Sequence, residues 1–372
     1  MKIYNKENSK KEKIFFNEIF EDNTRFCKKI NQIEYLNEGE IPIIDQGKSE
    51  IAGYSNLKEN IYNDIPAIIF GDHTRSIKYI DFPFLIGADG VKVLKNKRED
   101  FLDKYLYYAL KYFKIPNTGY NRHFKWLKEV EIEYPEIEIQ TKIVKVLDKI
   151  VHIMNVKRQE IDNLNTLIKS RFTEMFGDPI VNSLRWPEEL IGDSNFVTKL
   201  AGFEYTQYIH YEKSGDVVMV KAQNVKNGKL NRKDLSYISN EVSNSLPRSQ
   251  LAVGDVVMTY VGANIGDVAV IDDEYKYHLA PNVAKIRPNA EKYNSVYFMY
   301  MLMFLNSYIV GNSADTAKAA LGMERIRKLK IFAPPMELQN QFATFVHSID
   351  KLKSHFLKLP VFSGLYVVKY TY

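Results

Sequence analysis

The chain contains an internal repeat, and this repeat limits its possible folds more than any other feature. A series of apolar residues, a proline and a glutamine recurs with every member displaced by 199 positions. The first copy is Leu127, Val130, Ile132, Pro135, Gln140, Ile143, Val146, Leu147 and Ile150, and the second is Ile326, Leu329, Ile331, Pro334, Gln339, Phe342, Phe345, Val346 and Ile349. A constant displacement over this length indicates a duplicated structural unit.

Each copy of the repeat follows a globular region and opens a helix. The regions 16–135 and 186–333 both place strand-like apolar runs first, such as 41–44 and 217–220. Helical patterns follow at 101–113 and 296–310. Strands followed by helices are typical of α+β domains. We therefore expect two duplicated α+β domains separated by long helices.

The first of these long helices has the clearest pattern in the chain. Apolar residues alternate at steps of four and three from Ile143 to Met175, which is the heptad spacing of a coiled coil. The pattern predicts a helix from Glu138 to Phe176 that ends at the Gly-Asp-Pro turn of residues 177–179. Such a helix is roughly 55 Å long, which is too long to be enclosed within one domain.

A second, shorter heptad pattern follows the double proline at 334–335 and runs to Leu359. We expect the two helices to form an antiparallel coiled coil, with Gln339 near Phe176 and Leu359 opposite Val156. Two unrelated amphipathic surface helices are the alternative, because periodicity does not name a helix's partner. The predicted organisation is a first domain, a long helix, a second domain, a shortened helix and an atypical tail, with bounds 1–135, 136–177, 178–335, 336–359 and 360–372.

Composition is typical of a two-domain protein from a reducing compartment. The chain has 372 residues, 45% of them hydrophobic, which suffices for two cores. Its single cysteine, Cys27, excludes a disulfide framework. The first residues are charged, unlike a signal peptide, and the longest apolar run, 296–305, is too short to span a bilayer. We expect a cytoplasmic protein whose net charge of +5 permits nucleic-acid binding.

Motifs for bond chemistry are missing from the sequence. The Gly-Lys pairs at 47–48 and 228–229 lack the glycine that opens a phosphate-binding loop. The double proline lacks the preceding Asn or Asp and the following ring of an adenine methyltransferase loop. We therefore expect a non-enzymatic chain with no cofactor.

One acidic group leaves a nuclease alternative open. Asp255 precedes a Glu-x-Lys pattern at Glu274 and Lys276, and such carboxylates can hold Mg²⁺. Glu-x-Lys is common by chance, and the acidic run 272–274 is also typical of a hairpin turn. The histidines lack the spacing of zinc ligands. We expect no catalytic metal.

Two polar loops in the first globular region are candidates for DNA contact. The loop 71–75 follows a predicted strand and holds His73, Thr74 and Arg75. Arginine pairs bidentately with guanine, and Thr or His reaches base edges or phosphate. The loop 119–126 interleaves basic side chains with rings and holds Arg122, His123 and Lys125. Solvated charged loops are the alternative for both.

The second globular region has polar candidates of a different kind. Amides that can pair with adenine, and their polar neighbours, are Lys221, Gln223, Asn224, Lys226, Thr259 and Asn264. A basic cluster that can grip phosphate includes Lys318, Arg325 and Arg327. A turn for Asn264 and an ordinary helix surface for the arginines are the alternatives.

At this point the chain resembles the specificity subunits of type I restriction-modification systems. The matching segments are 135–140, 169–179 and 334–339, and their repeated spacing strengthens the match. The resemblance implies that each globular domain recognises one half of a bipartite double-stranded DNA site. It also implies that methyltransferase subunits and ATP-dependent restriction subunits dock on this frame. A DNA-free coiled-coil scaffold is the other alternative.

The shortened second helix departs from the family pattern and leaves the first half of the long helix without its partner. Ile143, Leu147, Ile150 and Met154 are then expected to form an exposed apolar stripe. Covering each side chain is worth about 1.5–3 kcal/mol. We expect a second copy of the chain, a methyltransferase subunit or the aromatic tail to cover this stripe.

Overall fold

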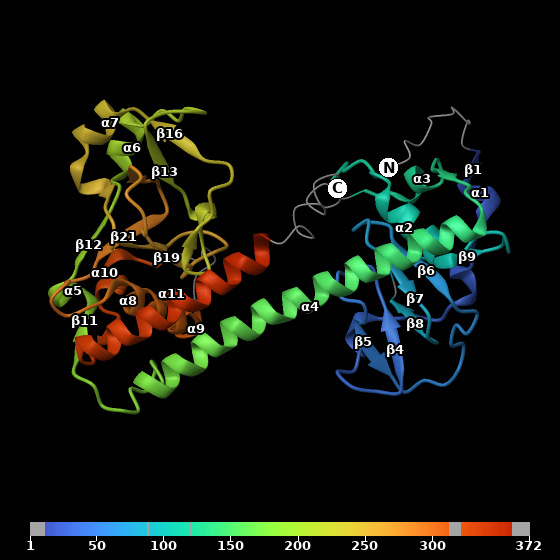
Figure 1. Cartoon of the computed structure of the whole chain (residues 1–372), viewed down its shortest axis with the longest axis horizontal. Helices are drawn as coiled ribbons and strands as arrows, with labels where there is room; N and C mark the ends of the chain where they lie inside the picture. Colours follow the sequence, from blue (N-terminus) through green and yellow to red (C-terminus); the bar gives the residue numbers. More distant parts are fainter. Residues whose placement is uncertain (1–11, 88, 120, 312–320, 359–372) are drawn as a thin grey trace, which may run out of the picture. The chain divides into compact units, whose positions relative to one another are not determined.

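The computed structural model describes residues 12–87, 89–119, 121–311 and 321–358. The chain divides into two compact units, with the division inside the long helix after Arg158. We call the unit up to Arg158 the first body and the unit 159–356 the second body, and we describe each by itself. Figure 1 shows sheets and helices in both. Among the described residues, no helix has the length and apolar character that crossing a bilayer requires.

The first body contains a two-stranded pair, β1-β10, and two sheets with the strand orders β2-β9-β6-β7 and β3-β8-β4-β5. The strands are β1 Lys13–Phe15, β2 Phe20–Asp22, β3 Lys29–Ile30, β4 Ile41–Ile44, β5 Gly53–Ser55, β6 Ala67–Gly71, β7 Ile77–Ile80, β8 Leu85–Gly87, β9 Val91–Asn96 and β10 Glu131–Glu133. The helices are α1 Phe16–Ile19, α2 Asp103–Tyr112 and α3 Phe124–Leu127.

The second body contains the pairs β11-β22 and β14-β15 and two sheets with the orders β12-β21-β18-β19 and β16-β13-β20-β17. The strands are β11 Glu188–Leu190, β12 Phe196–Lys199, β13 Val217–Val220, β14 Val225–Lys226, β15 Lys229–Leu230, β16 Ser236–Ile238, β17 Gln250–Leu251, β18 Val256–Thr259, β19 Val268–Val270, β20 Tyr277–Leu279, β21 Val283–Arg287 and β22 Lys330–Phe332. The helices are α5 Ile191–Ser194, α6 Gly202–Tyr208, α7 Asn240–Ser245, α8 Ser295–Phe304, α9 Asn306–Gly311 and α10 Met323–Arg327.

The two bodies share one strand topology. The pair β11-β22 corresponds to β1-β10, and the sheet β12-β21-β18-β19 corresponds to β2-β9-β6-β7. In the remaining sheet, β20, β13 and β16 correspond to β8, β4 and β5, with the same parallel and antiparallel pairings. The flanking strand differs, because β3 is parallel to β8 whereas β17 is antiparallel to β20. The structure confirms the predicted α+β class and its duplication.

In each body, one inner strand of a four-stranded sheet is apolar on both faces because it lies between two clusters of buried apolar side chains. In β6, Ile68 and Phe70 belong to one cluster and Ala67 and Ile69 to another. Successive side chains of a strand point to opposite faces, so a strand between two cores needs a continuous apolar run. Strand β18 is arranged in the same way in the second body.

The two repeat helices are α4 (Ile137–Phe176, 40 residues) and α11 (Met336–Lys358, 23 residues). In the second body, the ring of Phe342 lies 5.4 Å from that of Phe172 and 5.6 Å from that of Phe176. Helix α11 therefore begins beside the end of α4 and runs back along it (Figure 1). This is the predicted antiparallel arrangement. Leu359, the other residue of the predicted register, lies outside the described residues.

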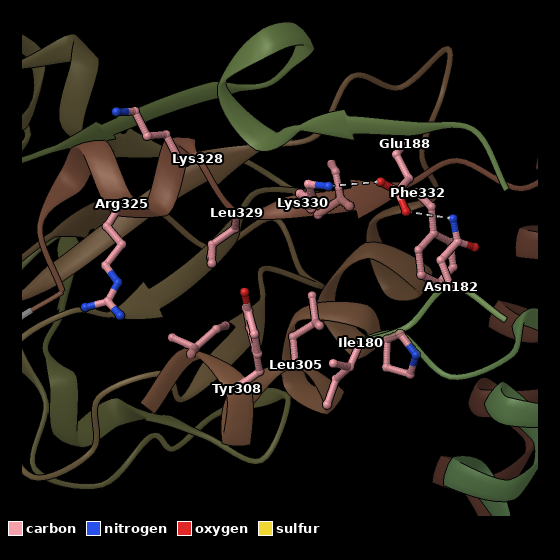
Figure 2. A pocket seen from close by; sticks show the side chains of 13 residues that line it. Ile180, Asn182, Glu188, Leu305, Tyr308, Arg325, Lys328, Leu329, Lys330 and Phe332 are labelled. Atoms are coloured by element: carbon pink, nitrogen blue, oxygen red, sulfur yellow. Dashed lines mark hydrogen bonds and ion pairs between the residues drawn. The ribbon is translucent and has the colours of Figure 1, made fainter. Parts of the chain in front are cut away.

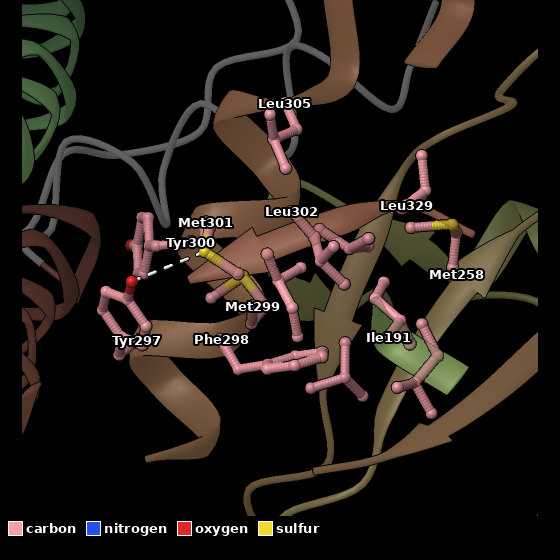
Figure 3. Packing of buried hydrophobic residues seen from close by; sticks show 14 of the residues in the cluster. Ile191, Met258, Tyr297, Phe298, Met299, Tyr300, Met301, Leu302, Leu305 and Leu329 are labelled. Carbon is pink, nitrogen blue, oxygen red and sulfur yellow. Dashed lines mark hydrogen bonds between the residues drawn. The ribbon is translucent and has the colours of Figure 1, made fainter. Parts of the chain in front are cut away.

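Helix α8 forms the centre of the larger core of the second body. It is apolar around its whole circumference, as expected of a helix buried on all sides. Figure 3 shows its side chains among those of neighbouring strands and helices. The ring of Tyr297 stacks 5.7 Å from that of Phe172, and its hydroxyl donates to the carbonyl of Phe332 at 3.1 Å. This residue therefore joins α8 to both α4 and β22.

A buried glutamine fixes α4 to the first body. The side-chain carbonyl of Gln140 accepts a hydrogen bond from the N–H of Leu102, the residue that precedes α2, at 2.9 Å. Its amide donates to the carbonyls of Asp100 and Pro135, each at 2.9 Å. The glutamine thereby joins the start of α4 to the start of α2.

Gln339 repeats this arrangement in the second body. Its side-chain carbonyl accepts a hydrogen bond from the N–H of Asn294, which precedes α8, at 2.9 Å. Its amide donates to the carbonyls of Lys292 and Pro334, each at 2.8 Å. The glutamine found in the sequence repeat is therefore a structural link, duplicated with the fold.

The apolar stripe predicted on the first half of α4 is partly covered by the first body itself. Ile143 and its neighbour Val144 pack against the core of that body. The other members, Leu147, Ile150 and Met154, are half-buried. The prediction that all four side chains are exposed was therefore wrong, because it did not include contacts between the helix and its own body.

Candidate nucleic-acid interface

The first body brings its two predicted DNA loops together. Asp72, which follows β6, accepts hydrogen bonds from the N–H of His123 at its carbonyl (2.9 Å) and from the N–H of Phe124 at its carboxylate (2.7 Å). The Nδ1 atom of His123 lies 2.9 Å from the same carbonyl. Asp72 and His123 are both buried. The segments 71–76 and 121–124 therefore form one surface with a shared buried support.

A third loop, residues 45–50, completes this surface. The side-chain carbonyl of Gln46 accepts a hydrogen bond from the N–H of His73 at 3.2 Å, and its backbone carbonyl accepts one from the hydroxyl of Thr74 at 2.5 Å. Buried Lys78 donates to the carbonyl of Asp45 at 2.7 Å. Burial lowers the pKa of Lys78, although the Asp45 carboxylate opposes this effect. These contacts fix the loops in advance, which reduces the ordering cost of binding a ligand.

Several predicted side chains on this surface remain accessible. Thr74, Arg122 and Lys125 are exposed, and His73 and Arg75 are half-buried. Arg75 donates to the carbonyl of Ile115 at 3.4 Å, and since a guanidinium has five N–H donors, others remain for a base or a phosphate. The Lys125 ammonium lies 5.0 Å from the centre of the Trp126 ring. Cations interleaved with rings and polar loops are typical of a nucleic-acid surface.

The second body presents the corresponding strand ends. The carbonyl of Tyr260, which follows β18, accepts a hydrogen bond from the N–H of Leu321 at 2.8 Å, as that of Asp72 does in the first body. The ammonium of Lys199, at the end of β12, lies 5.4 Å from the centre of the Tyr260 ring. The same kind of loop junction therefore recurs in both copies.

The residues of the second body that were predicted to contact DNA differ in their exposure to solvent. Gln223, Lys226 and Asn264 are exposed. Half-buried Lys221 donates to the carbonyl of Asp234 and the hydroxyl of Ser236, each at 3.0 Å. Asn264 lies in the turn between β18 and β19, where its carbonyl accepts a hydrogen bond from the N–H of Asp267 at 3.1 Å. Exposed amides such as those of Gln223 and Asn264 have the donor and acceptor pattern that pairs with adenine.

Three of the predicted DNA residues are buried, and two of them make hydrogen bonds within their own bodies instead. His123 supports Asp72, as described above. Asn224 donates to the carbonyls of Asn231 and Lys233 at 2.9 and 3.1 Å. Thr259 lies fully buried within β18. A side chain without exposed surface does not reach a base edge or a phosphate, so the structure removes these three residues from the candidate surface.

Two residues of the predicted basic cluster, Arg325 and Arg327, lie on α10. Arg327 pairs with Glu324 at 2.6 Å and donates to the carbonyl of Val197 at 3.1 Å, which ties α10 to β12. Arg325 instead lines a pocket on the second body (Figure 2). Lys318 lies outside the described residues. The structure therefore separates a supporting arginine from one that faces a cavity.

The nuclease alternative requires a carboxylate at Asp255 that can hold a metal ion. Asp255 is buried and accepts two hydrogen bonds from the Arg287 guanidinium, at 2.6 and 2.8 Å. Its carboxylate also accepts the N–H of Ala252 at 2.8 Å. Lys276 donates to Asn240 at 2.9 Å. This carboxylate is therefore occupied by a structural ion pair, which argues against the nuclease.

Sequence reasoning missed the residues that assemble the surface. Gln46 and Lys199 lie outside the candidate loops, and Asp72 lies within the loop 71–75 but was not among the residues proposed to contact DNA. Gln46 meets Thr74 and Lys199 meets Tyr260 only after the sheets have formed. The available signal was the repeat itself, which places these residues after or at the ends of corresponding strands.

Comparison with known proteins supports the interpretation that the chain contains a duplicated unit. The family model described as "Type I restriction modification DNA specificity domain" matches twice, at residues 8–166 and 200–358. The chain is 22% identical over 357 residues to the putative type I restriction enzyme MjaX specificity subunit of Methanocaldococcus jannaschii, covering 87% of this chain and 80% of the relative. It is 29% identical over 143 residues to the EcoR124I/EcoR124II specificity subunit of Escherichia coli, covering 35% of each chain.

A solved structure shares the fold. The type I restriction-modification system S subunit from M. genitalium matches with a TM-score of 0.57 at 16% identity, covering 100% of this chain and 96% of that one. The family model matches most of the chain, once for each copy of the repeat. The chain therefore belongs to the type I restriction modification DNA specificity family.

Proposed function

We propose that this chain recognises a bipartite double-stranded DNA sequence, one half with each body, for a complex whose other subunits methylate and cut DNA. The observation that carries this proposal is the duplication of the fold together with its loop junction. Each body has a hydrogen-bonded junction of loops at corresponding strand ends, and exposed hydrogen-bonding side chains lie on these loops in the first body and on the β18–β19 turn, at Asn264, in the second. Such groups are the ones that discriminate base edges.

The two bodies differ in the chemistry that they offer. The first exposes Thr74, Arg122 and Lys125 and half-exposes Arg75, whereas the second exposes the amides of Gln223 and Asn264. We infer that the first body relies on a guanidinium contact and the second on amide contacts. Different side chains on a shared fold are consistent with two different half-sites.

In this proposal the chain itself makes and breaks no bonds. Methyltransferase subunits and ATP-dependent restriction subunits dock on it and supply those activities. The pairing of Asp255 with Arg287 supports this assignment, because it occupies the carboxylate that a nuclease would need.

The test is DNA footprinting with the chain and its cognate methyltransferase subunit. We expect one bipartite protected sequence and an affinity that falls steeply with salt, since phosphate contacts release counterions. Protection without sequence preference would refute the proposal. With Mg²⁺, the purified chain alone should neither cut DNA nor hydrolyse ATP, and cleavage lost in Glu274→Ala would favour the nuclease instead.

A further inference from the structure

The loop that follows α4 is held by hydrogen bonds within itself and presents apolar side chains to solvent. The carboxylate of Asp178 accepts the N–H groups of Ile180 and Val181 at 2.7 and 3.2 Å. Asn182 bonds to both the N–H and the carbonyl of Trp186, at 2.9 and 2.8 Å. The loop nevertheless leaves three large apolar residues exposed, with fractions of 50% for Ile180, 70% for Val181 and 51% for Leu184.

Of these three side chains, Ile180 lines a pocket of about 330 Å³ in the second body, together with Pro179 and Asn182 of the same loop. Figure 2 shows Ile180, Leu305 and Tyr308 along one side of it. Tyr308 is itself 49% exposed, so the apolar area continues beyond the pocket. Large exposed apolar side chains beside a pocket are typical of a protein-binding site.

The rim of the pocket is cationic. Arg325 and Lys328 lie at one end, and Lys330 lies towards the other, where it pairs with Glu188 at 3.5 Å (Figure 2). Glu188 is the one carboxylate among the lining residues, and it also accepts a hydrogen bond from Asn182 at 3.0 Å. The Asn182 and Lys330 contacts lower the pKa of Glu188, so it stays ionised beside Lys330.

The first body does not repeat this charge. At the constant displacement of 199, Arg325, Lys328 and Lys330 correspond to Trp126, Glu129 and Glu131. The ion pair across the two-stranded sheet also has its charges exchanged. In the first body Lys13 of β1 pairs with Glu131 of β10, whereas in the second body Glu188 of β11 pairs with Lys330 of β22. A partner that requires cations at this place therefore distinguishes the second body from the first.

We propose that the pocket and the exposed loop 180–184 bind a protein segment that inserts a large apolar side chain and carries acidic residues beside it. The segment belongs to a methyltransferase subunit, so this inference rests on the proposed function. The apolar side chain fills the pocket against Leu305 and Tyr308, and the acidic residues meet Arg325 and Lys328. Opposite charges at the rim orient the partner, and the buried apolar anchor supplies affinity.

The experiment measures two affinities of the purified full chain, one for its cognate methyltransferase subunit and one for duplex DNA. The variants are Arg325→Glu/Lys328→Glu, which reverses the rim, and Ile180→Asp, which alters an exposed apolar residue. Val253→Asp is the matched apolar control, since Val253 is 57% exposed and outside this pocket. Lys213→Glu is the matched charge control on the same body.

We expect both pocket variants to weaken methyltransferase binding by roughly tenfold or more, while the free chain keeps its DNA affinity and both controls match the wild type. Binding of the wild type, but not of the charge-reversed variant, should weaken with salt. If both variants bind the methyltransferase subunit as tightly as the wild type does, the inference is overturned. In that case the proposed function still holds, provided that the complex of the wild-type chain selects one DNA sequence. Loss of DNA affinity alone would assign the rim to phosphate and also overturn it. A wild-type chain that binds no methyltransferase overturns both.

Discussion

Arg75 is the side chain whose chemistry most directly separates base recognition from phosphate binding. It lies on the loop after β6 with one guanidinium N–H directed to the carbonyl of Ile115. We expect Arg75→Ala to weaken DNA binding by about 1–3 kcal/mol and to relax discrimination at one position of the half-site. Arg75→Lys should keep the charge but lose a bidentate guanine contact.

The measurement is binding of the assembled complex to a panel of single-base variants of its site. Arg25→Ala serves as the control, because Arg25 is an exposed arginine of the same body outside the three loops. Equal weakening on every sequence would assign Arg75 to phosphate. Unchanged affinity on every sequence would remove it from the interface.

Lys285 gives a pH-dependent prediction for the stability of the second body. Its buried ammonium donates to the carbonyl of Gln250 at 2.7 Å, and burial lowers its pKa from 10.5 to about 8. Because the pKa is lower in the folded state, its contribution to stability is present above pH 10.5 and is lost as the pH falls to about 8.

Relative to Lys285→Met, the free energy of unfolding of the wild type should therefore decrease by on the order of 3 kcal/mol as the pH falls through this window. Urea unfolding of both proteins across the window measures the difference. A difference that does not change with pH would contradict this account of Lys285.

At this scale the sequence indicated which loops matter but not which of their side chains reach solvent. Arg122 and His123 are adjacent, yet one is exposed and the other is fully buried against Asp72. Burial of His123 depends on a contact with a residue 51 positions away. Residue type and local spacing do not contain that information, so the DNA assignment of His123 failed.

At the scale of elements, amphipathic periodicity was a reliable guide and uniform hydrophobicity was not. The helix predicted from Glu138 to Phe176 is α4, Ile137–Phe176, because its apolar residues lie on one face. The helix predicted over 296–310 is instead divided into α8 and α9. Helix α8 is apolar on all sides, so it has no separate apolar face whose period could mark where the helix ends.

The duplicated glutamines predict how the repeat helices depend on their bodies. Gln339→Leu removes three hydrogen bonds and leaves the N–H of Asn294 and the carbonyls of Lys292 and Pro334 without this partner. We expect a loss of about 1–3 kcal/mol in the free energy of unfolding. Gln140→Leu should have a similar effect in the first body.

Urea unfolding measures both effects, with Gln159→Leu as the control because Gln159 is exposed on α4. If Gln339→Leu were as stable as Gln159→Leu, the glutamine would not be the link that we describe.

At the scale of the whole molecule, the repeat predicted the architecture because each copy has its own strands, proline, glutamine and helix. The matching orders of the sheets β2-β9-β6-β7 and β12-β21-β18-β19 confirm that prediction. The exchange of β3 for β17 at one sheet edge was not predictable, because short edge strands have little sequence signal. Shared supports with divergent surface side chains are what independent recognition of two half-sites requires.

Exchange of one body tests the central claim most directly. Residues 186–333 are replaced by the corresponding body of a relative, and the DNA sequence selected by the complex with its methyltransferase subunit is determined by footprinting. The account predicts that one half of the bipartite sequence changes and the other half stays the same. A change in both halves, or in neither, would contradict it.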